Sequence, residues 1–336
     1  MSDSARLEAI VRGFRGRRVL VLADLVADEF VYGRVERISR EAPVLILRHD
    51  STDVRLGGGA NAVHNIRTLG GAPVPFGVLG KDAHGRALRA LLREKGIPAG
   101  GVAEEGGYAT PVKSRILAGR AHSTKQQVVR LDRYAPLAPR AAARRAVERA
   151  LASFRGPVDG VLVSDYGFGL LDARLVRAAV AFARRRRVPV TVDSRFGLLR
   201  FRGMTAVTPN EPEVEEALGV TIGHDQRRLE VAGRTLLERL GCRAVLVTRG
   251  SDGMALFEPG RPPVHIGIYG TDEVADVTGA GDTVIATFTL ALAAGAGPEE
   301  AARLANYAGG IVVMKHATAT VSADELVAAV RGDAAR

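Results

Sequence analysis

The sequence has one cysteine and no tryptophan among its 336 residues, and aromatic residues make up only 5% of it. The single thiol, Cys242, excludes an intrachain disulfide framework and a cysteine-rich zinc site. No stretch approaches the ~20 consecutive apolar residues that a membrane-spanning helix needs, and residues 1–18 lack the apolar core of a secretory signal. We therefore expect a cytoplasmic protein that is neither secreted nor inserted in a membrane.

Two common nucleotide-binding signatures are also missing. The sequence contains no G-x-x-x-x-G-K-[ST] loop, and no G-x-G-x-x-G follows the first apolar run, Arg18–Asp24. The net charge of +10 raises the question of nucleic-acid binding, but the basic residues are dispersed and do not alternate with aromatic ones. Anionic small molecules, such as a nucleotide and a sugar phosphate, therefore explain the positive charge better than a nucleic acid does.

What is present is the composition and the pattern of a globular α/β protein. Apolar residues make up 46% of the chain and charged residues 25%, enough for a large core. Short apolar runs alternate with segments of helical spacing, which predicts a doubly wound sheet flanked by helices. Residues within about 30–55 and 108–134 instead alternate polar with apolar side chains, which is typical of half-exposed strands in a separate small sheet.

The segment from Asp276 to Asp282, with the sequence DVTGAGD, precedes an apolar run that extends to Ala294. Backbone amides at the start of a helix favour a bound anion, and the small residues let that anion approach closely. Asp282 would lie beside a bound phosphate and could accept a proton from an attacking hydroxyl. A tight strand-to-helix turn explains the four residues GAGD equally well, but the longer string is more specific.

This string resembles the C-terminal signature of the ribokinase-like (PfkB) carbohydrate kinases. The resemblance covers roughly residues 16–325 and implies a ribokinase-like doubly wound sheet with a small β lid. It also implies that Gly279, Ala280 and Gly281 form the anion hole and that Asp282 is the catalytic base. We expect residues 1–336 to form one such kinase domain, without a fused nucleotidyltransferase module.

The resemblance assigns several residues to the sugar. Asp28, one short turn after the first strand, matches a carboxylate that binds sugar hydroxyls, although a turn cap explains this residue equally well on its own. The run GGGANAVHN matches the N-terminal glycine signature of the family and contains Gly58, Asn61 and Asn65. Asp165 belongs to an SDY motif that, with RISREAPV at 37–44, is similar to the D-glycero-β-D-manno-heptose-7-phosphate kinases.

Basic side chains in the second lid range, 108–134, suggest a substrate that already carries a phosphate. Lys113, Arg115 and Arg130 lie in the strings KSR and QQVVRLD, which also resemble the heptose kinases. A solvated lid face is the alternative explanation for these charges.

A further group of motifs implies an ATP and Mg²⁺ site. The string TPNEPE resembles the family's magnesium motif, in which Asn210 and Glu213 organise the ion, with Glu213 as the metal ligand. Without the resemblance, residues 211–216 would be an ordinary acidic first helical turn. The string TRGSDG resembles the nucleotide loop and implies Thr248, Gly250 and Gly253, and Asn306 stands at the position beside adenine.

Three positions depart from the pattern. Phe168 replaces a lysine, Arg195 follows Asp193-Ser194 where the family has Asp-Pro-Lys, and Ala317 replaces a glycine in the loop that, with the Asp276 segment, binds K⁺ in some relatives. The resemblance makes K⁺ a candidate ligand, which the change at Ala317 leaves open, and it implies a homodimer through the lid.

The sequence thus predicts an ATP-dependent kinase that transfers phosphate to O1 of D-glycero-β-D-manno-heptose 7-phosphate. The main alternative is a kinase of the same fold for another sugar or sugar phosphate. A catalytically silent sugar or nucleotide sensor and a nucleic-acid regulator are the alternatives from other classes, and the intact Asp282 disfavours the sensor.

Overall fold

A nine-stranded sheet forms the centre of the computed structural model, which describes residues 3–119, 125–134, 138–270 and 275–334. Within these residues the strand order is β13-β12-β11-β10-β9-β8-β1-β4-β5. The pairs are parallel from β5 to β11 and antiparallel from β11 to β13. The strands are β1 (Arg18–Ala23), β4 (Ala72–Gly80), β5 (Gly101–Glu105), β8 (Gly160–Asp165), β9 (Val190–Ser194), β10 (Ala206–Val207), β11 (Ala244–Thr248), β12 (Met254–Phe257) and β13 (Val264–Ile266).

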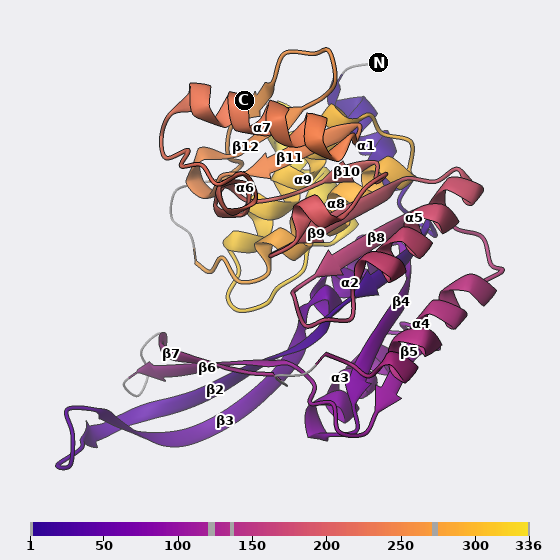
Figure 1. Cartoon of the computed structure of the whole chain (residues 1–336). Coiled ribbons are helices and arrows are strands. Elements are labelled where there is room, and N and C mark those ends of the chain that lie inside the picture. Colours follow the sequence, from indigo (N-terminus) through magenta and orange to yellow (C-terminus); the bar gives the residue numbers. More distant parts are fainter. Residues whose placement is uncertain (1–2, 120–124, 135–137, 271–274, 335–336) are drawn as a thin grey trace.

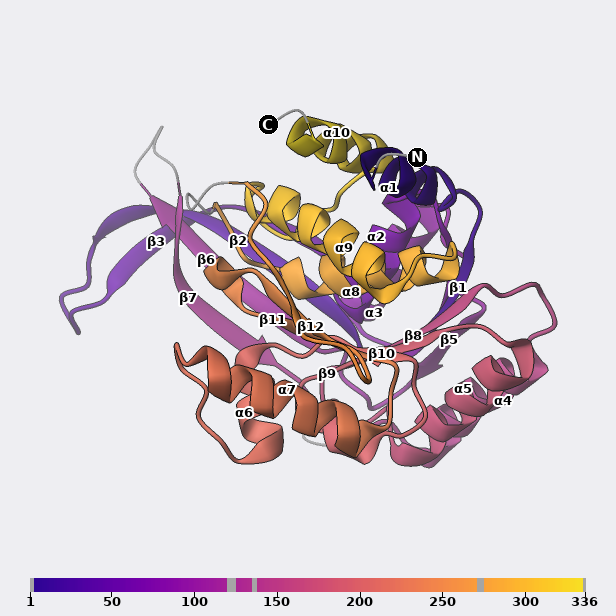
Figure 2. The same ribbon diagram turned by 90° about the horizontal axis from the view of Figure 1, so that it is seen from above.

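Helices cover both faces of this sheet because its central strands are apolar on both sides. In β1, Val19 and Val21 face one buried cluster, whereas Leu20 and Leu22 face the other. Figure 2 shows the two helix layers. The first contains α1 (Asp3–Arg12), α2 (Gly59–Thr68), α3 (Ala83–Glu94), α8 (Ala280–Ala293), α9 (Pro298–Val313) and α10 (Ala323–Ala334), and the second contains α4 (Ala141–Ser153), α5 (Ala173–Arg186), α6 (Glu211–Leu218) and α7 (Gln226–Leu240). Short 3₁₀ turns are η1 (Leu198–Arg200) and η2 (Gly250–Asp252). The predicted fold class is confirmed.

A second sheet of four strands projects from the body (Figure 1). Its order is β3-β2-β6-β7, with β2 (Leu25–Ile38), β3 (Leu45–Gly58), β6 (Val112–Gly119) and β7 (Gln126–Arg133). These strands overlap the two ranges expected for the lid. Only Asp24 separates β1 from β2, so Asp28 lies inside a lid strand and not in a loop after the first strand.

The parallel strands bring their carboxyl ends to one edge of the sheet, where α8 also begins. The loops after β1, β8, β9, β10 and β11 therefore meet at this edge, as expected for the ligand-binding side of a doubly wound sheet. No helix in the described ranges is both long and apolar enough to span a bilayer.

Candidate active site

A cavity of about 1290 Å³ lies where the lid strands meet the carboxyl edge of the main sheet. This volume exceeds the roughly 300–1,000 Å³ that is usual for one small molecule, so the cavity has room for two substrates. Nine of the predicted site residues line it: Lys113, Arg115, Arg130, Asp165, Asn210, Glu213, Thr248, Gly279 and Gly281.

Asp282 lies in the first turn of α8, buried immediately behind this cavity. Its Oδ2 accepts a hydrogen bond from Asn61 Nδ2 (3.1 Å), and its Oδ1 accepts one from the hydroxyl of Tyr166 (2.7 Å). Burial raises the pKa of the Asp282 carboxyl to about 6, although both hydrogen bonds act in the opposite direction. A carboxylate with such a pKa is a competent general base near neutral pH.

Asn65 holds Asn61 in place from the next turn of α2. The Asn65 amide donates to both the carbonyl oxygen and Oδ1 of Asn61, and its own Oδ1 accepts from Thr283 Oγ1. Both asparagines are fully buried. The structure therefore brings Asn61 and Asn65 to Asp282, and Asn65 contacts the cavity only through its neighbours.

The start of α8 presents free amides to the cavity. Gly279 is the N-cap with φ 79°, and a Cβ there would lie 2.5 Å from Asn61 Nδ2, so only glycine fits. The Ala280 amide donates to the Val277 carbonyl (3.2 Å). Among the described residues the amides of Gly279 and Gly281 have no acceptor, which leaves these two amides as the anion donors of the predicted three residues.

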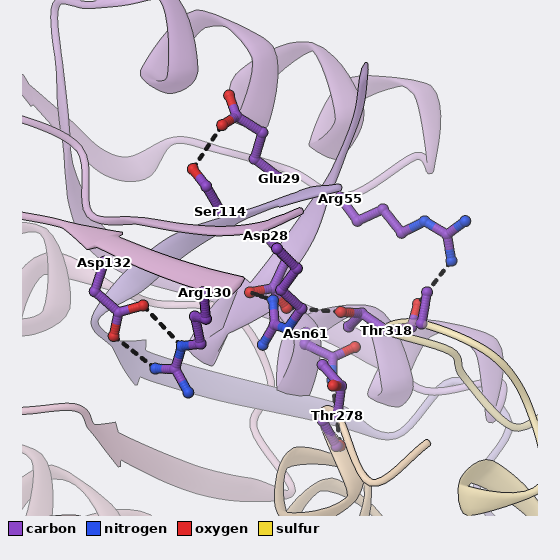
Figure 3. Close-up of polar contacts among 12 residues, drawn as sticks. Asp28, Glu29, Arg55, Asn61, Ser114, Arg130, Asp132, Thr278 and Thr318 are labelled. Atoms are coloured by element: carbon purple, nitrogen blue, oxygen red, sulfur yellow. Dashed lines mark hydrogen bonds and ion pairs between the residues drawn. The ribbon is translucent and has the colours of Figure 1, made fainter. Parts of the chain in front are cut away.

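Asp28 is held by two side chains, one from lid strand β6 and one from the loop before α10. Arg115 Nη1 donates to its Oδ1 (2.8 Å), and Thr318 Oγ1 donates to its Oδ2 (2.6 Å). Asp28 and Arg115 are only 3% and 7% exposed, so the ion pair is buried. Figure 3 shows the Thr318 contact beside Asn61. A Cβ at Gly57 would lie 2.5 Å from the Asp28 carboxyl, so this glycine makes room for it.

The three predicted phosphate-binding cations have different partners. Arg130 makes a bidentate ion pair with Asp132 on its own strand (Figure 3), and Arg115 forms an ion pair with Asp28. The Lys113 ammonium, by contrast, lies 4.2 Å from the ring centroid of Tyr166 and has no hydrogen-bond acceptor in the described part of the chain. Lys113 is therefore the cation of the three that is available to a ligand.

Asn210 and Glu213 form a capping box at the start of α6. Asn210 Oδ1 accepts from the Glu213 amide and Glu213 Oε2 accepts from the Asn210 amide, both at 2.9 Å. Burial raises the pKa of Glu213 to about 7, and burial together with Glu213 raises that of Asp193. A divalent cation fits here because its charge would compensate these two partly buried carboxylates.

Of the predicted nucleotide residues, Thr248 lines the same cavity. Thr248 pairs with Asn210 through an isolated β-bridge. Gly250 and Gly253 both have positive φ in the turn before β12, and a Cβ at Gly253 would lie 2.1 Å from the Ile266 carbonyl. Asn306 Nδ2 donates to the Gly267 carbonyl (2.8 Å) instead of facing the cavity.

Several site residues were absent from the predicted set. Tyr166 contacts Asp282, and Thr318 contacts Asp28. The Asp276 carboxylate accepts hydrogen bonds from the amides of Thr278 and Ala317, and so joins the two loops of the predicted K⁺ site. The SDY motif was the available signal for Tyr166, and the loop around Ala317, which resembles a family motif, was the signal for Thr318. Gly58, the remaining predicted residue, packs on Tyr166.

The family model that matches this chain is "pfkB family carbohydrate kinase", over residues 170–325. Two curated relatives are the "Bifunctional protein HldE" of Citrifermentans bemidjiense, 42% identical over 93% of this chain, and that of Caulobacter sp. strain K31, 41% identical over 97%. Residues 170–325 thus carry a PfkB carbohydrate kinase domain. The chain spans 63% and 65% of the lengths of these two relatives.

Solved structures show the same fold for this chain. Arabidopsis thaliana ribokinase, solved with ribose and ATP, matches with a TM-score of 0.69 and 20% identity over 94% of this chain and 99% of its own. Phosphofructokinase-2 from Escherichia coli, solved with potassium, matches with a TM-score of 0.74 and 19% identity over 95% and 99%. These matches confirm the predicted ribokinase-like architecture.

Proposed function

We propose that this protein is an ATP- and Mg²⁺-dependent kinase that phosphorylates O1 of D-glycero-β-D-manno-heptose 7-phosphate. The observation that carries the proposal is Asp282, a buried carboxylate with a raised pKa beside the free amides that begin α8. The relatives named HldE and the lid and SDY motifs favour a heptose over other sugars.

In the proposed mechanism Asp282 accepts the proton of the attacking hydroxyl. Asn61 and Tyr166 hold the two carboxylate oxygens, so little reorganisation precedes proton transfer. The amides of Gly279 and Gly281 stabilise charge on the phosphoryl group in transfer. Bound Mg²⁺, which Glu213 and Asn210 would hold through oxygen atoms and waters, supplies further charge neutralisation at the nucleotide phosphates. Thr248, Gly250 and Gly253 are proposed to form the nucleotide side, and Asn306 to support it through its hydrogen bond to the Gly267 carbonyl.

The sugar phosphate would occupy the lid side of the cavity. Lys113 is the proposed cation for its phosphate, because Arg115 and Arg130 are already paired with carboxylates. Arg195 also lines the cavity and stands in for the lysine of the usual motif. Asp28, Gly58, Asn65 and Asp165 shape the sugar site, in which Asp165 accepts from Ser194 Oγ (2.8 Å).

The alternative is a kinase for another sugar or sugar phosphate. Phe168, which contacts Tyr134 at 5.4 Å between ring centroids, gives the turn after β8 an aromatic surface in place of a cation. The absence of this cation favours a substrate with fewer anionic groups.

Turnover of Mg·ATP against heptose 7-phosphate, fructose 1- and 6-phosphates, ribose and fructose separates these proposals. We expect heptose 7-phosphate to be the preferred substrate and Asp282→Asn, which keeps the fold, to lose about 10³-fold or more in kcat. Preference for an unphosphorylated sugar would overturn the role of Lys113. Unchanged turnover in Asp282→Asn would remove Asp282 as the base.

We further propose a cytoplasmic location, a single kinase domain over residues 1–336, a K⁺ site between the Asp276 and Ala317 loops, and a homodimer formed through the lid. The contact between the Ala317 amide and Asp276 Oδ2 (3.0 Å) supports the K⁺ site because it brings the two loops together. Dependence of kcat on KCl against NaCl tests this site.

A further inference from the structure

Tyr166 lies between the lid and the catalytic carboxylate. It follows β8, and its hydroxyl donates to Asp282 Oδ1 at 2.7 Å. Its ring lies under the Lys113 ammonium, 4.2 Å from the ring centroid, and Lys113 belongs to lid strand β6. One side chain thus contacts both the group proposed to accept the proton and the cation proposed to bind the substrate phosphate.

The position of this ring is fixed by its surroundings. The Tyr166 amide donates to Asp24 Oδ2 (2.9 Å), which anchors the turn after β8 to the end of β1. Gly58 packs so closely that a Cβ there would lie 3.2 Å from Tyr166 Cε2. These two contacts limit the movement of the ring and keep its hydroxyl near Asp282.

We propose that Tyr166 is a positioning residue, whose hydroxyl orients the Asp282 carboxylate and whose ring holds the Lys113 ammonium at the substrate site. This inference rests on the proposed kinase function. Asn61 fixes Oδ2 of Asp282 and Tyr166 fixes Oδ1, so the carboxylate cannot rotate away from the cavity. Orientation of this kind contributes by reducing the reorganisation that precedes proton transfer.

Tyr166 also stays protonated as the donor. Burial and the charge of Asp282 raise the pKa of its phenol well above the usual value, so its hydroxyl does not compete for the proton at neutral pH. Donation to the ionised carboxylate lowers the pKa of Asp282. The other charged groups facing Asp282 are Lys113, which lowers its pKa, and Asp28, which raises it; Asp193 also interacts with Asp282.

The variant Tyr166→Phe removes the hydroxyl and keeps the ring under Lys113. We expect kcat to fall about 10- to 100-fold, with KM for Mg·ATP and for the sugar phosphate unchanged. The acidic limb of the pH profile of kcat/KM should move to higher pH, because Asp282 loses a hydrogen bond that favours its ionised form. A purely structural role would lower activity without moving this limb.

The variant Tyr166→Leu removes the hydroxyl and the ring together. It should show the same shift of the acidic limb and also raise KM for the sugar phosphate, because Lys113 loses its cation–π partner. A Tyr166→Phe profile that coincides with the wild-type profile, at wild-type kcat, would overturn the proposal.

A direct titration separates this inference from the proposed function. Protein carrying ¹³C at the aspartate carboxyl carbons, with Asp282→Asn to assign the signal, reports the pKa of Asp282 without any substrate. Tyr166→Phe should raise that pKa; an unchanged value would overturn the positioning role even if the kinase is active. If the pKa rises but no sugar is phosphorylated, the kinase proposal fails and the orientation of Asp282 by Tyr166 stands.

Discussion

Gly279 brings the backbone close to the candidate site. Its φ of 79° suits glycine, and a Cβ would lie 2.5 Å from the side-chain nitrogen Nδ2 of Asn61. The same nitrogen donates a hydrogen bond to Asp282. A single methyl group here would both strain the backbone and push Asn61 away from the carboxylate.

Gly279→Ala should therefore lower the free energy of unfolding by about 2–4 kcal/mol and reduce kcat about 10-fold or more. Gly295→Ala is the matched control, because Gly295 has φ 89° and no atom lies within 4 Å of the position that a Cβ would take there. The control should lose only about 1 kcal/mol. Urea unfolding of the two variants measures the difference, and equal losses would show that the contact with Asn61 is unimportant.

Asp24 gives the stability of the protein a pH dependence. Burial raises its pKa to about 7, chiefly by desolvation and then by the nearby charge of Asp165. Because the folded-state pKa lies above the unfolded value of 3.8, its stabilising contribution is complete below pH 3.8 and is lost as the pH rises toward 7.

Wild-type protein should therefore lose roughly 2–3 kcal/mol of stability between pH 5 and pH 8 through this group. In Asp24→Asn that loss should disappear, because the amide does not titrate and its oxygen can still accept from the amides of Tyr166 and Phe168. Denaturant unfolding at several pH values tests this, and an equal slope in both proteins would contradict it.

The helices of the second layer differ in how they end. Helices α6 and α7 end at Gly219 and Gly241 in the left-handed conformation, whereas α5 ends at Arg187 with φ 57°. A residue with a Cβ is strained there, and glycine is the usual cap. The end of α5 is therefore less stable than the ends of its neighbours.

Arg187→Gly should raise the free energy of unfolding by about 0.5–1 kcal/mol, since relief of strain exceeds the added entropy of the unfolded chain. Arg186→Gly, one residue earlier inside α5, should lower it by about 1 kcal/mol. Thermal unfolding of the pair measures both signs. A decrease in both variants would show that the Arg187 side chain, not its backbone, stabilises this helix end.

At the scale of the whole molecule the lid has an exposed apolar face. Arg130 and Arg115, which are paired across β7 and β6, line the cavity, so their strand neighbours point away from it. Val129 and Leu131 on that outer face are 48% and 52% exposed. Such a face is typical of an association surface, and it supports the proposed homodimer.

Leu131→Asp should shift the protein toward monomer in sedimentation or light scattering, because an aspartate would be buried without a partner in the proposed interface. Val231→Asp is the control, since Val231 is 66% exposed on α7, far from the lid. The control should leave the assembly unchanged. A wild-type protein that is monomeric at all concentrations would remove the homodimer proposal.

The sequence by itself determined the fold class, the family resemblance and several of the elements. Apolar runs such as 18–23 and 160–165 are buried on both sides, so their strands were predictable, as was the start of a helix at the glycines of DVTGAGD. These features depend on residues within one local segment, and hydrophobic period and turn chemistry act over that range.

Only the tertiary structure decided which charges and hydrogen bonds are paired. Asn61 and Asp282 are 221 positions apart, Tyr166 and Asp282 are 116 apart, and Arg115 and Asp28 are 87 apart. Three basic residues of the lid look equivalent in the sequence, yet two are neutralised by carboxylates and Lys113 is not. The physical reason is that a hydrogen bond or ion pair acts over a few ångströms, and the packing of distant segments alone sets those distances.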